Sequence, residues 1–175
     1  MSIYVEINEL VNEMVKDGRL YHLSPAFTGY TKRRMYVSPE VNDFVVGPWH
    51  DEKTSRQGNA LRAVIDRYLD GRRVTVSNDK DADVNMKQLT PTSDEVWEIR
   101  SKKEPPAIRV FGSFVKKDIF VGLTWAFRIE LGEIDSKEWE LALRAYKHEW
   151  KKLFHAYTPL SGDNFNEYLS NILPL

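Results

Sequence analysis

The segment 96–128 concentrates basic side chains that could hold a phosphate group. It contains seven cations against three carboxylates, a net charge of +4, whereas the whole chain carries −1. Arg100 and Arg109 stand out, because a guanidinium group can bind phosphate through two hydrogen bonds and stays charged at every accessible pH. Two interpretations are open: a phosphate-binding face, or a solvated face on which the arginines pair with Glu98 across the strands. The other five cations are Lys102, Lys103, Lys116, Lys117 and Arg128.

Several other kinds of chemistry have no support in the sequence. The chain has no cysteine, which excludes disulfides, thiolate nucleophiles and cysteine-based zinc sites. His148 and His155 lie two helical turns apart, roughly 10.5 Å, which is too far for one tetrahedral metal, and both are expected on an exposed helix face. There is no G-x-S-x-G, P-loop or G-x-G-x-x-G motif. We therefore expect neither a metal site nor a bound cofactor.

Three β-rich runs, 96–100, 107–111 and 119–127, must position the two arginines. Short polar stretches separate the runs, so they predict an antiparallel meander. Because side chains alternate along a strand, Trp97 and Ile99 share one face and Arg100 points to the other. We expect Trp97 to face the helix that follows the meander, and the cations to cluster on the opposite, solvated side.

Helices are predicted on both sides of the meander. Apolar residues recur at helical spacing over 4–17, over 51–70 and from Ser136 onward, where Trp139, Tyr146 and Trp150 form one stripe and Ser136 is the expected N-cap. A short final helix is expected around 165–172. Residues 35–46 are predicted to be extended, as one strand or two. The basic run 32–34 lies in a loop and is interpreted as a solvated turn in preference to a nucleic-acid contact.

Composition places the chain among folded proteins that do not enter a membrane. Its 175 residues are 42% hydrophobic and 12% aromatic, enough to form a core. A net charge of −1 provides no general attraction to nucleic acid or anionic lipid, so any such contact must be local. No segment approaches about 18 uninterrupted apolar residues, and the first residues lack the pattern of a leader. We expect a cytoplasmic protein with no membrane partner.

The middle of the chain resembles the RelE/HigB-like toxin family of toxin–antitoxin modules. The resemblance covers roughly 34–155, and its core, 86–128, begins with Met86-Lys87-Gln88-Leu89 and continues through V-W-E-I-R at 96–100, I-R-V-F at 108–111 and the long apolar run to Arg128. Arg100 and Arg109 match the arginines on the strands of the family. The chain departs from the pattern at Gly112, where the family often has an aromatic residue, and at Ile129, where a second basic residue is usual.

The resemblance implies an α+β fold with a small, mostly antiparallel sheet flanked by helices. It divides the chain into an N-terminal extension over 1–33, a core over 34–157 and a C-terminal helical extension over 158–175. It also implies a metal-free endoribonuclease that cleaves mRNA with the ribosome, and an antitoxin protein as partner. Fold alone does not establish activity. A non-catalytic RNA- or protein-binding member of the same fold, and an unrelated α+β domain, remain alternatives.

Metal-free RNA cleavage would assign roles to particular residues. The ribose 2′-OH attacks its own phosphate, so a base must accept its proton, an acid must protonate the leaving oxygen, and cations must stabilise the added negative charge. Arg100 and Arg109 suit the last role. Lys87, Lys116 and His148 are candidates for the proton transfers, and Lys87 is taken with the two arginines as catalytic. The remaining cations, Lys102, Lys103, Lys116, Lys117 and Arg128, are assigned to RNA binding.

Overall fold

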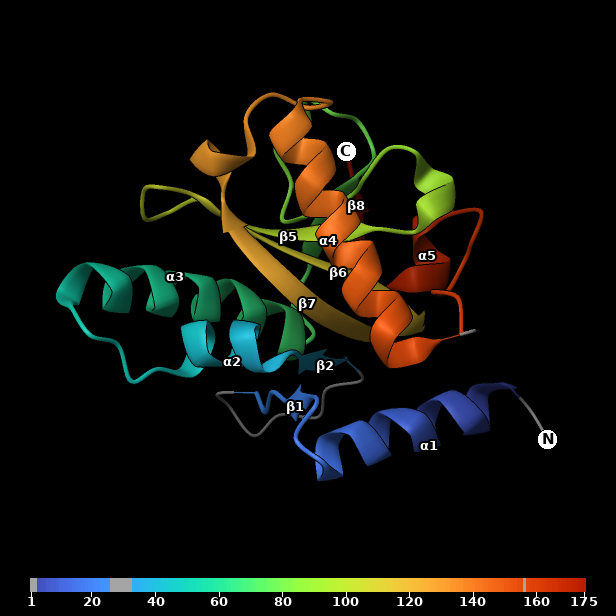
Figure 1. The fold of residues 1–175 in the computed structure, drawn as a ribbon. Helices are drawn as coiled ribbons and strands as arrows, with labels where there is room; N and C mark the ends of the chain where they lie inside the picture. The colour runs from blue at the N-terminus through green and yellow to red at the C-terminus, as the bar shows by residue number, and fades with distance from the viewer. Residues whose placement is uncertain (1–2, 26–32, 156) are drawn as a thin grey trace.

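A mixed β-sheet with helices on both faces is formed by residues 3–25, 33–155 and 157–175, which the computed structural model describes (Figure 1). Strands pair in the order β1-β2-β7-β6-β5-β4-β3-β8. The pairs β2–β7, β3–β4 and β3–β8 are parallel and the other four are antiparallel. The α+β class is as predicted, but the sheet is larger and partly parallel. The strands are β1 Tyr21–His22, β2 Arg34–Val37, β3 Val74–Ser77, β4 Met86–Gln88, β5 Trp97–Ser101, β6 Ile108–Lys116, β7 Ile119–Phe127 and β8 Ile172–Pro174.

The predicted meander forms the centre of this sheet. Strands β5, β6 and β7 pair antiparallel in sequence order, and Arg100 lies directly opposite Arg109. The β6–β7 ladder is irregular beside Gly112. A Cβ atom at Gly112 would lie 2.3 Å from the carbonyl oxygen of Val121, so no larger residue fits without movement of the neighbouring strand.

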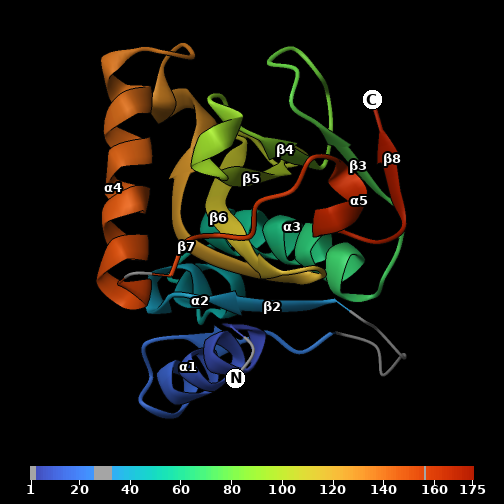
Figure 2. The ribbon, with the colours of Figure 1, turned by 90° about the vertical axis from the view of Figure 1, so that its right-hand side faces the viewer.

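Helices cover both faces of the sheet. Side chains of α2, α3 and α5 pack with one face, and those of α1 and α4 pack with the other. Figure 2 shows α4 on one side of the sheet and α3 on the opposite side. The side chains of Asp51 and Ser136 cap α3 and α4. The helices are α1 Ile3–Lys16, α2 Pro39–Val46, α3 Glu52–Leu69, α4 Lys137–Phe154 and α5 Phe165–Tyr168, with short 3₁₀ helices η1 Thr92–Asp94 and η2 Arg128–Leu131.

The helix α4 covers the face that carries the arginines, and the prediction that it covers the Trp97 face is wrong. Trp97 and Ile99 pack in the cluster formed with α3, and the Trp97 ring lies 5.8 Å from the Phe165 ring of α5. On the other face, the Trp139 ring of α4 lies 6.1 Å from the Phe111 ring. Both faces of the long strands are apolar over much of their length, so alternation separates the two faces without assigning a helix to either one.

Residues 39–46 form the helix α2, so the prediction of an extended segment holds only for the part that is β2. Ser38 accepts a hydrogen bond from the backbone N–H of Val41, and Pro39 stands at the first helical position. Proline suits that position because its missing N–H would have no partner in the first turn. Ser38 also donates to the carbonyl oxygen of Leu123, at 2.7 Å, which ties the start of α2 to β7.

The chain near its C-terminus completes the sheet. The predicted final helix is confined to α5, and β8 follows it beside β3. Arg33, expected in a solvated turn, is 2% exposed and donates to backbone carbonyls of Tyr68 and Arg72 and of two residues before β8, Ser170 and Asn171. Arg34 is exposed, and Lys32 lies outside the described residues. None of the helices in the described ranges is long and apolar enough to cross a membrane.

Candidate functional site

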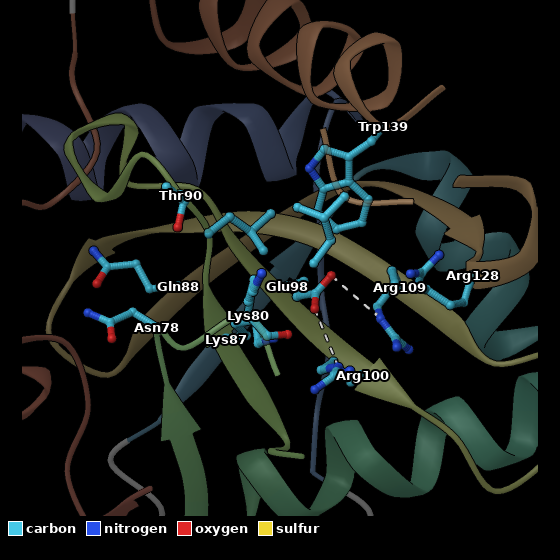
Figure 3. A pocket seen from close by; sticks show the side chains of 12 residues that line it. Asn78, Lys80, Lys87, Gln88, Thr90, Glu98, Arg100, Arg109, Arg128 and Trp139 are labelled. Atoms are coloured by element: carbon cyan, nitrogen blue, oxygen red, sulfur yellow. Dashed lines mark hydrogen bonds and ion pairs between the residues drawn. The ribbon is translucent and has the colours of Figure 1, made fainter. Parts of the chain in front are cut away.

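A cationic pocket opens on the face of the sheet that α4 covers (Figure 3). Its volume is about 80 Å³, room for several water molecules or one phosphate group. Strands β4, β5 and β6 form its floor, Arg128 of η2 and Trp139 of α4 border it on one side, and the loop after β3 borders it on the other. Five cations and one carboxylate line it, a net charge of +4. They are Lys80, Lys87, Arg100, Arg109, Arg128 and Glu98.

Glu98 lies between the two strand arginines. Arg100 Nε is 3.4 Å from Glu98 Oε1, and Arg109 Nε is 3.5 Å from Glu98 Oε2. Both distances exceed the usual range for charge-assisted hydrogen bonds. Among the described residues, Glu98 Oε2 and Arg100 Nε are buried and have no hydrogen-bond partner. A ligand that donates a hydrogen bond to Glu98, or accepts one from Arg100, would satisfy these groups.

Backbone carbonyl groups hold the cations in place. Arg100 donates to the carbonyl oxygen of Ala82 at 2.7 Å, and Arg109 donates to its neighbour Ile108 at 3.1 Å. Lys87 donates to the carbonyl oxygen of Lys80. Arg128 donates to Gly132 at 2.5 Å, and its guanidinium group stands 5.9 Å from the centre of the Trp139 ring. These contacts orient the cations before any ligand binds.

Burial shifts the pKa values of three groups in the pocket. It raises the pKa of Glu98, although Arg109, Arg100 and Lys87 oppose that shift. It lowers the pKa of Arg109 to about 10, even though Glu98 acts in the opposite direction. Burial, followed by the nearby Arg100, also lowers the pKa of Lys87. Such opposed shifts of a carboxyl group and an amine are typical of sites that transfer protons.

Four of the predicted site residues come together in this pocket: Arg100, Arg109, Lys87 and Arg128. The prediction that the two arginines lie on one face is confirmed by their register. The prediction that this face is open to solvent is wrong: Arg109 is 4% exposed and the Arg100 side chain 14% exposed, and both pair with Glu98, as the alternative interpretation expected.

Four predicted RNA-binding lysines do not line the pocket. Lys102 is exposed beside it and pairs with Asp83. Lys103 is exposed in the loop between β5 and β6. Lys116 and Lys117 lie at the turn from β6 to β7, at the end of β6 opposite to Arg109. The prediction that Lys116 and Lys117 cluster with the arginines is wrong, because β6 is nine residues long and separates them.

The sequence interpretation included Glu98 only as a cross-strand partner of the two arginines, and the structure confirms that pairing. It missed the contributions of Lys80, Asn78 and Gln88. Alternation puts Glu98 on the same face as Arg100, and Glu98 lies directly opposite Lys87 in the β4–β5 ladder. No comparable signal exists for Asn78 and Lys80, because they reach the pocket through the parallel pairing of β3 with β4.

Other candidate residues remain outside the pocket. His148 on α4 and His155, directly after its end, are both exposed, as predicted. Within the described part of the chain, no group of three or more His, Cys, Asp or Glu residues could hold a metal ion. No family model, curated protein or solved structure matches the chain. Function is therefore inferred from the chemistry of the cationic pocket.

Proposed function

We propose that the cationic pocket binds a phosphate group of RNA and that the chain is a RelE/HigB-like endoribonuclease that cleaves mRNA with the ribosome. The observation that carries this proposal is the arrangement of five cations around one buried carboxylate in a single pocket. An RNA phosphate is negatively charged and would balance the excess positive charge of this pocket. The register of Arg100 with Arg109 supports the proposal, since both residues line the same pocket and pair with the same carboxylate.

Each step of cleavage has a side chain to perform it. Glu98 accepts the proton of the 2′-OH as that oxygen attacks the adjacent phosphorus. Arg100 and Arg109 stabilise the negative charge that builds up on the phosphorane. Lys87 donates a proton to the 5′ oxygen as its bond to phosphorus breaks, and its lowered pKa makes it a stronger acid than an ordinary lysine. The products are a 2′,3′-cyclic phosphate and a free 5′-OH.

RNA binding without cleavage is the second candidate function. It is favoured by the ion pairs of Arg100 and Arg109 with Glu98, because Glu98 already neutralises part of the positive charge of both arginines. In this case Glu98 holds the arginines in place and transfers no proton. RNA would then bind with an affinity that falls steeply as salt concentration rises, and would remain intact.

A translation reaction with purified ribosomes, a defined mRNA and the full chain tests cleavage directly. We expect cleaved mRNA, detected by primer extension. Glu98→Gln and Arg100→Ala should each slow cleavage by about 100-fold or more, because each removes a group that acts only as the transition state forms. Arg144→Ala is the matched control, since Arg144 is exposed on α4 and does not line the pocket.

Circular dichroism and thermal unfolding of each variant show whether lost activity reflects lost structure. Intact mRNA with folded wild-type protein and active ribosomes would overturn the ribonuclease proposal. Filter binding of the same mRNA over a range of salt concentrations then decides the second candidate. Salt-sensitive binding that Arg100→Ala weakens and Arg144→Ala does not would support binding without cleavage, and equal weakening by both would contradict it.

A further inference from the structure

The cationic pocket is too small to admit a nucleotide in the form that the structure shows. Its volume of about 80 Å³ is room for one phosphate group, whereas pockets that enclose a whole small molecule usually measure about 300 Å³ or more. Lys87 and Arg109 are each only 4% exposed, so a phosphate within an RNA chain cannot reach them unless the pocket widens. One wall of the pocket must therefore move before RNA binds.

The loop after β3 is the wall that can move. The floor strands β4, β5 and β6 each pair with a strand on both sides, and Trp139 at the α4 wall is buried. Residues 79–83 of the loop, which we call the strap, contain no helix or strand, and none of their five side chains is buried. Segments with few buried contacts open at the lowest free energy. Movement of the strap therefore widens the pocket most easily.

Three cations hold the strap in place, and two of them, Lys87 and Arg100, line the cationic pocket (Figure 3). Each cation contacts an oxygen atom of the strap. The three pairs are Lys87 with the carbonyl oxygen of Lys80, Arg100 with the carbonyl oxygen of Ala82 at 2.7 Å, and Lys102 with the carboxylate of Asp83. Opening of the strap would free donors of Lys87 and Arg100 for a ligand.

The charge of the strap also favours the closed position. The strap carries three carboxylates and one amine, a net charge of −2, and it borders a pocket with a net charge of +4. Attraction between opposite charges therefore holds the strap against the pocket, and the same carboxylates repel an approaching RNA phosphate. The charged residues of the strap are Asp79, Asp81, Asp83 and Lys80.

From these contacts we propose that the strap is an autoinhibitory device, which closes the cationic pocket to RNA and must open before RNA binds. The inference deepens the proposed function, on which the choice of RNA as the ligand rests. Because only the open form accepts RNA, the closed form lowers the apparent affinity for RNA by the fraction of molecules that are closed. Inorganic phosphate fits the closed pocket, so the strap should not affect its binding.

A covalent bridge across the pair of Asp83 and Lys102 tests whether the strap must open. The two side chains are 84% and 36% exposed, and the chain has no cysteine, so Asp83→Cys with Lys102→Cys introduces the only two thiols. A short bismaleimide bridges them, and the same double variant capped with N-ethylmaleimide is the matched control. We expect bridging to weaken binding of a single-stranded RNA hexamer by about tenfold or more, measured by fluorescence anisotropy. Calorimetry should show equal binding of inorganic phosphate to both proteins.

Loosening the strap should have the opposite effect on RNA binding. Asp83→Asn removes the exposed ion pair with Lys102, so we expect the RNA hexamer to bind about two- to fivefold more tightly. Asp43→Asn, the same exchange on the exposed surface of α2, is the matched control for the change in net charge. Equal tightening in both variants would contradict the strap, because net charge alone would then explain the effect.

The results for bridged and capped protein distinguish the strap from the proposed function. Equal RNA binding by the two proteins overturns the strap, and so does a capped protein that does not bind the hexamer at about 1 mM. A bridge that weakens phosphate binding as much as RNA binding also overturns it, because the bridge then disturbs the cations. Tenfold weaker RNA binding on bridging, in a protein that leaves mRNA intact on the ribosome, supports the strap and contradicts the ribonuclease. Equal cleavage of mRNA by bridged and capped protein contradicts the strap and supports the ribonuclease.

Discussion

At the scale of single residues, Glu98 and the two arginines beside it form an arrangement that costs stability. Burial of charged groups is unfavourable unless ion pairs and hydrogen bonds compensate for the lost hydration. The distances of 3.4 and 3.5 Å are longer than those of charge-assisted hydrogen bonds, so the compensation is incomplete. Replacing the group with well-packed apolar side chains would often be neutral or stabilising. A polar cluster that is expensive to bury and incompletely hydrogen-bonded is typical of a ligand site.

If the proposed cleavage takes place, the pKa shifts in the pocket predict how its rate depends on pH. Glu98 must be ionised to accept a proton, and its pKa is raised, so the acidic limb of the rate profile should lie above pH 4.5. Lys87 must be protonated to act as the acid, and its pKa is lowered, so the alkaline limb should lie below pH 10.5. The rate should therefore follow a bell-shaped curve between these limits.

Single-turnover cleavage measured from about pH 4 to pH 10 checks the assignment. Glu98→Gln should remove the acidic limb from whatever activity remains, and Lys87→Gln should remove the alkaline limb. The unfolding midpoint of each protein, measured at every pH used, separates titration of the site from unfolding. An acidic limb that persists unchanged in Glu98→Gln would assign proton acceptance to another group.

At the scale of elements, the sequence predicts the structure where periodicity and caps agree. The helices α3 and α4 combine an apolar stripe with the N-caps Asp51 and Ser136, and both were predictable within two residues. The helix α2 has equally good start signals in Ser38 and Pro39. Its short apolar run ends in Phe44-Val45-Val46, which favours a strand by composition, so tertiary packing decided its conformation.

The candidate site was predictable only where it depends on local alternation. The shared face of Arg100 and Arg109 follows from two neighbouring strands of one meander. The loop residues Asn78 and Lys80 reach the pocket through the parallel pairing of β3 with β4. These contacts join segments whose separation in sequence hides their proximity, so no local pattern could reveal them.

Ser38 provides a test of how α2 is anchored. Ser38→Ala removes both the cap of α2 and the hydrogen bond to Leu123, so we expect the free energy of unfolding to fall by about 1–2 kcal/mol. Urea denaturation measures the change. Ser38→Thr keeps the hydroxyl and should recover most of the loss. If Ser38→Ala unfolds at the wild-type urea concentration, the cap does not contribute to stability.

At the scale of the whole molecule, Arg33 joins the start of β2 to the end of α3 and to the chain just before β8. Its buried guanidinium group bonds to carbonyls at the end of α3 and just before β8, and it also lies 5.4 Å from the centre of the Tyr68 ring. One cation thus connects the start of β2, the helix α3 and the C-terminal strand. Asp118, 4.0 Å from Arg33, accepts from the backbone N–H of Ser170 and reinforces this junction.

We expect Arg33→Met to lower the free energy of unfolding by about 3 kcal/mol or more, because several buried carbonyl groups lose their donor. Backbone amides of β8 should also exchange hydrogen faster, since Arg33 bonds to Ser170 and Asn171 directly before that strand. Urea denaturation and hydrogen exchange measure the two effects. Arg34→Met is the matched control, because the neighbouring Arg34 side chain is exposed. Similar losses in both variants would contradict this role.

The arrangement of parallel and antiparallel pairs also orders the assembly of the sheet in time. The hairpins of the central meander join strands that are adjacent in sequence, so their closure loses little chain entropy. The outer pairs are distant in sequence, with Arg34 opposite Ile119 and Val74 opposite Ile172. Pairs of this kind form slowly. While the chain folds, the meander is therefore expected to exist with both of its flanks unpaired, and a newly made molecule is most prone to aggregate during that interval.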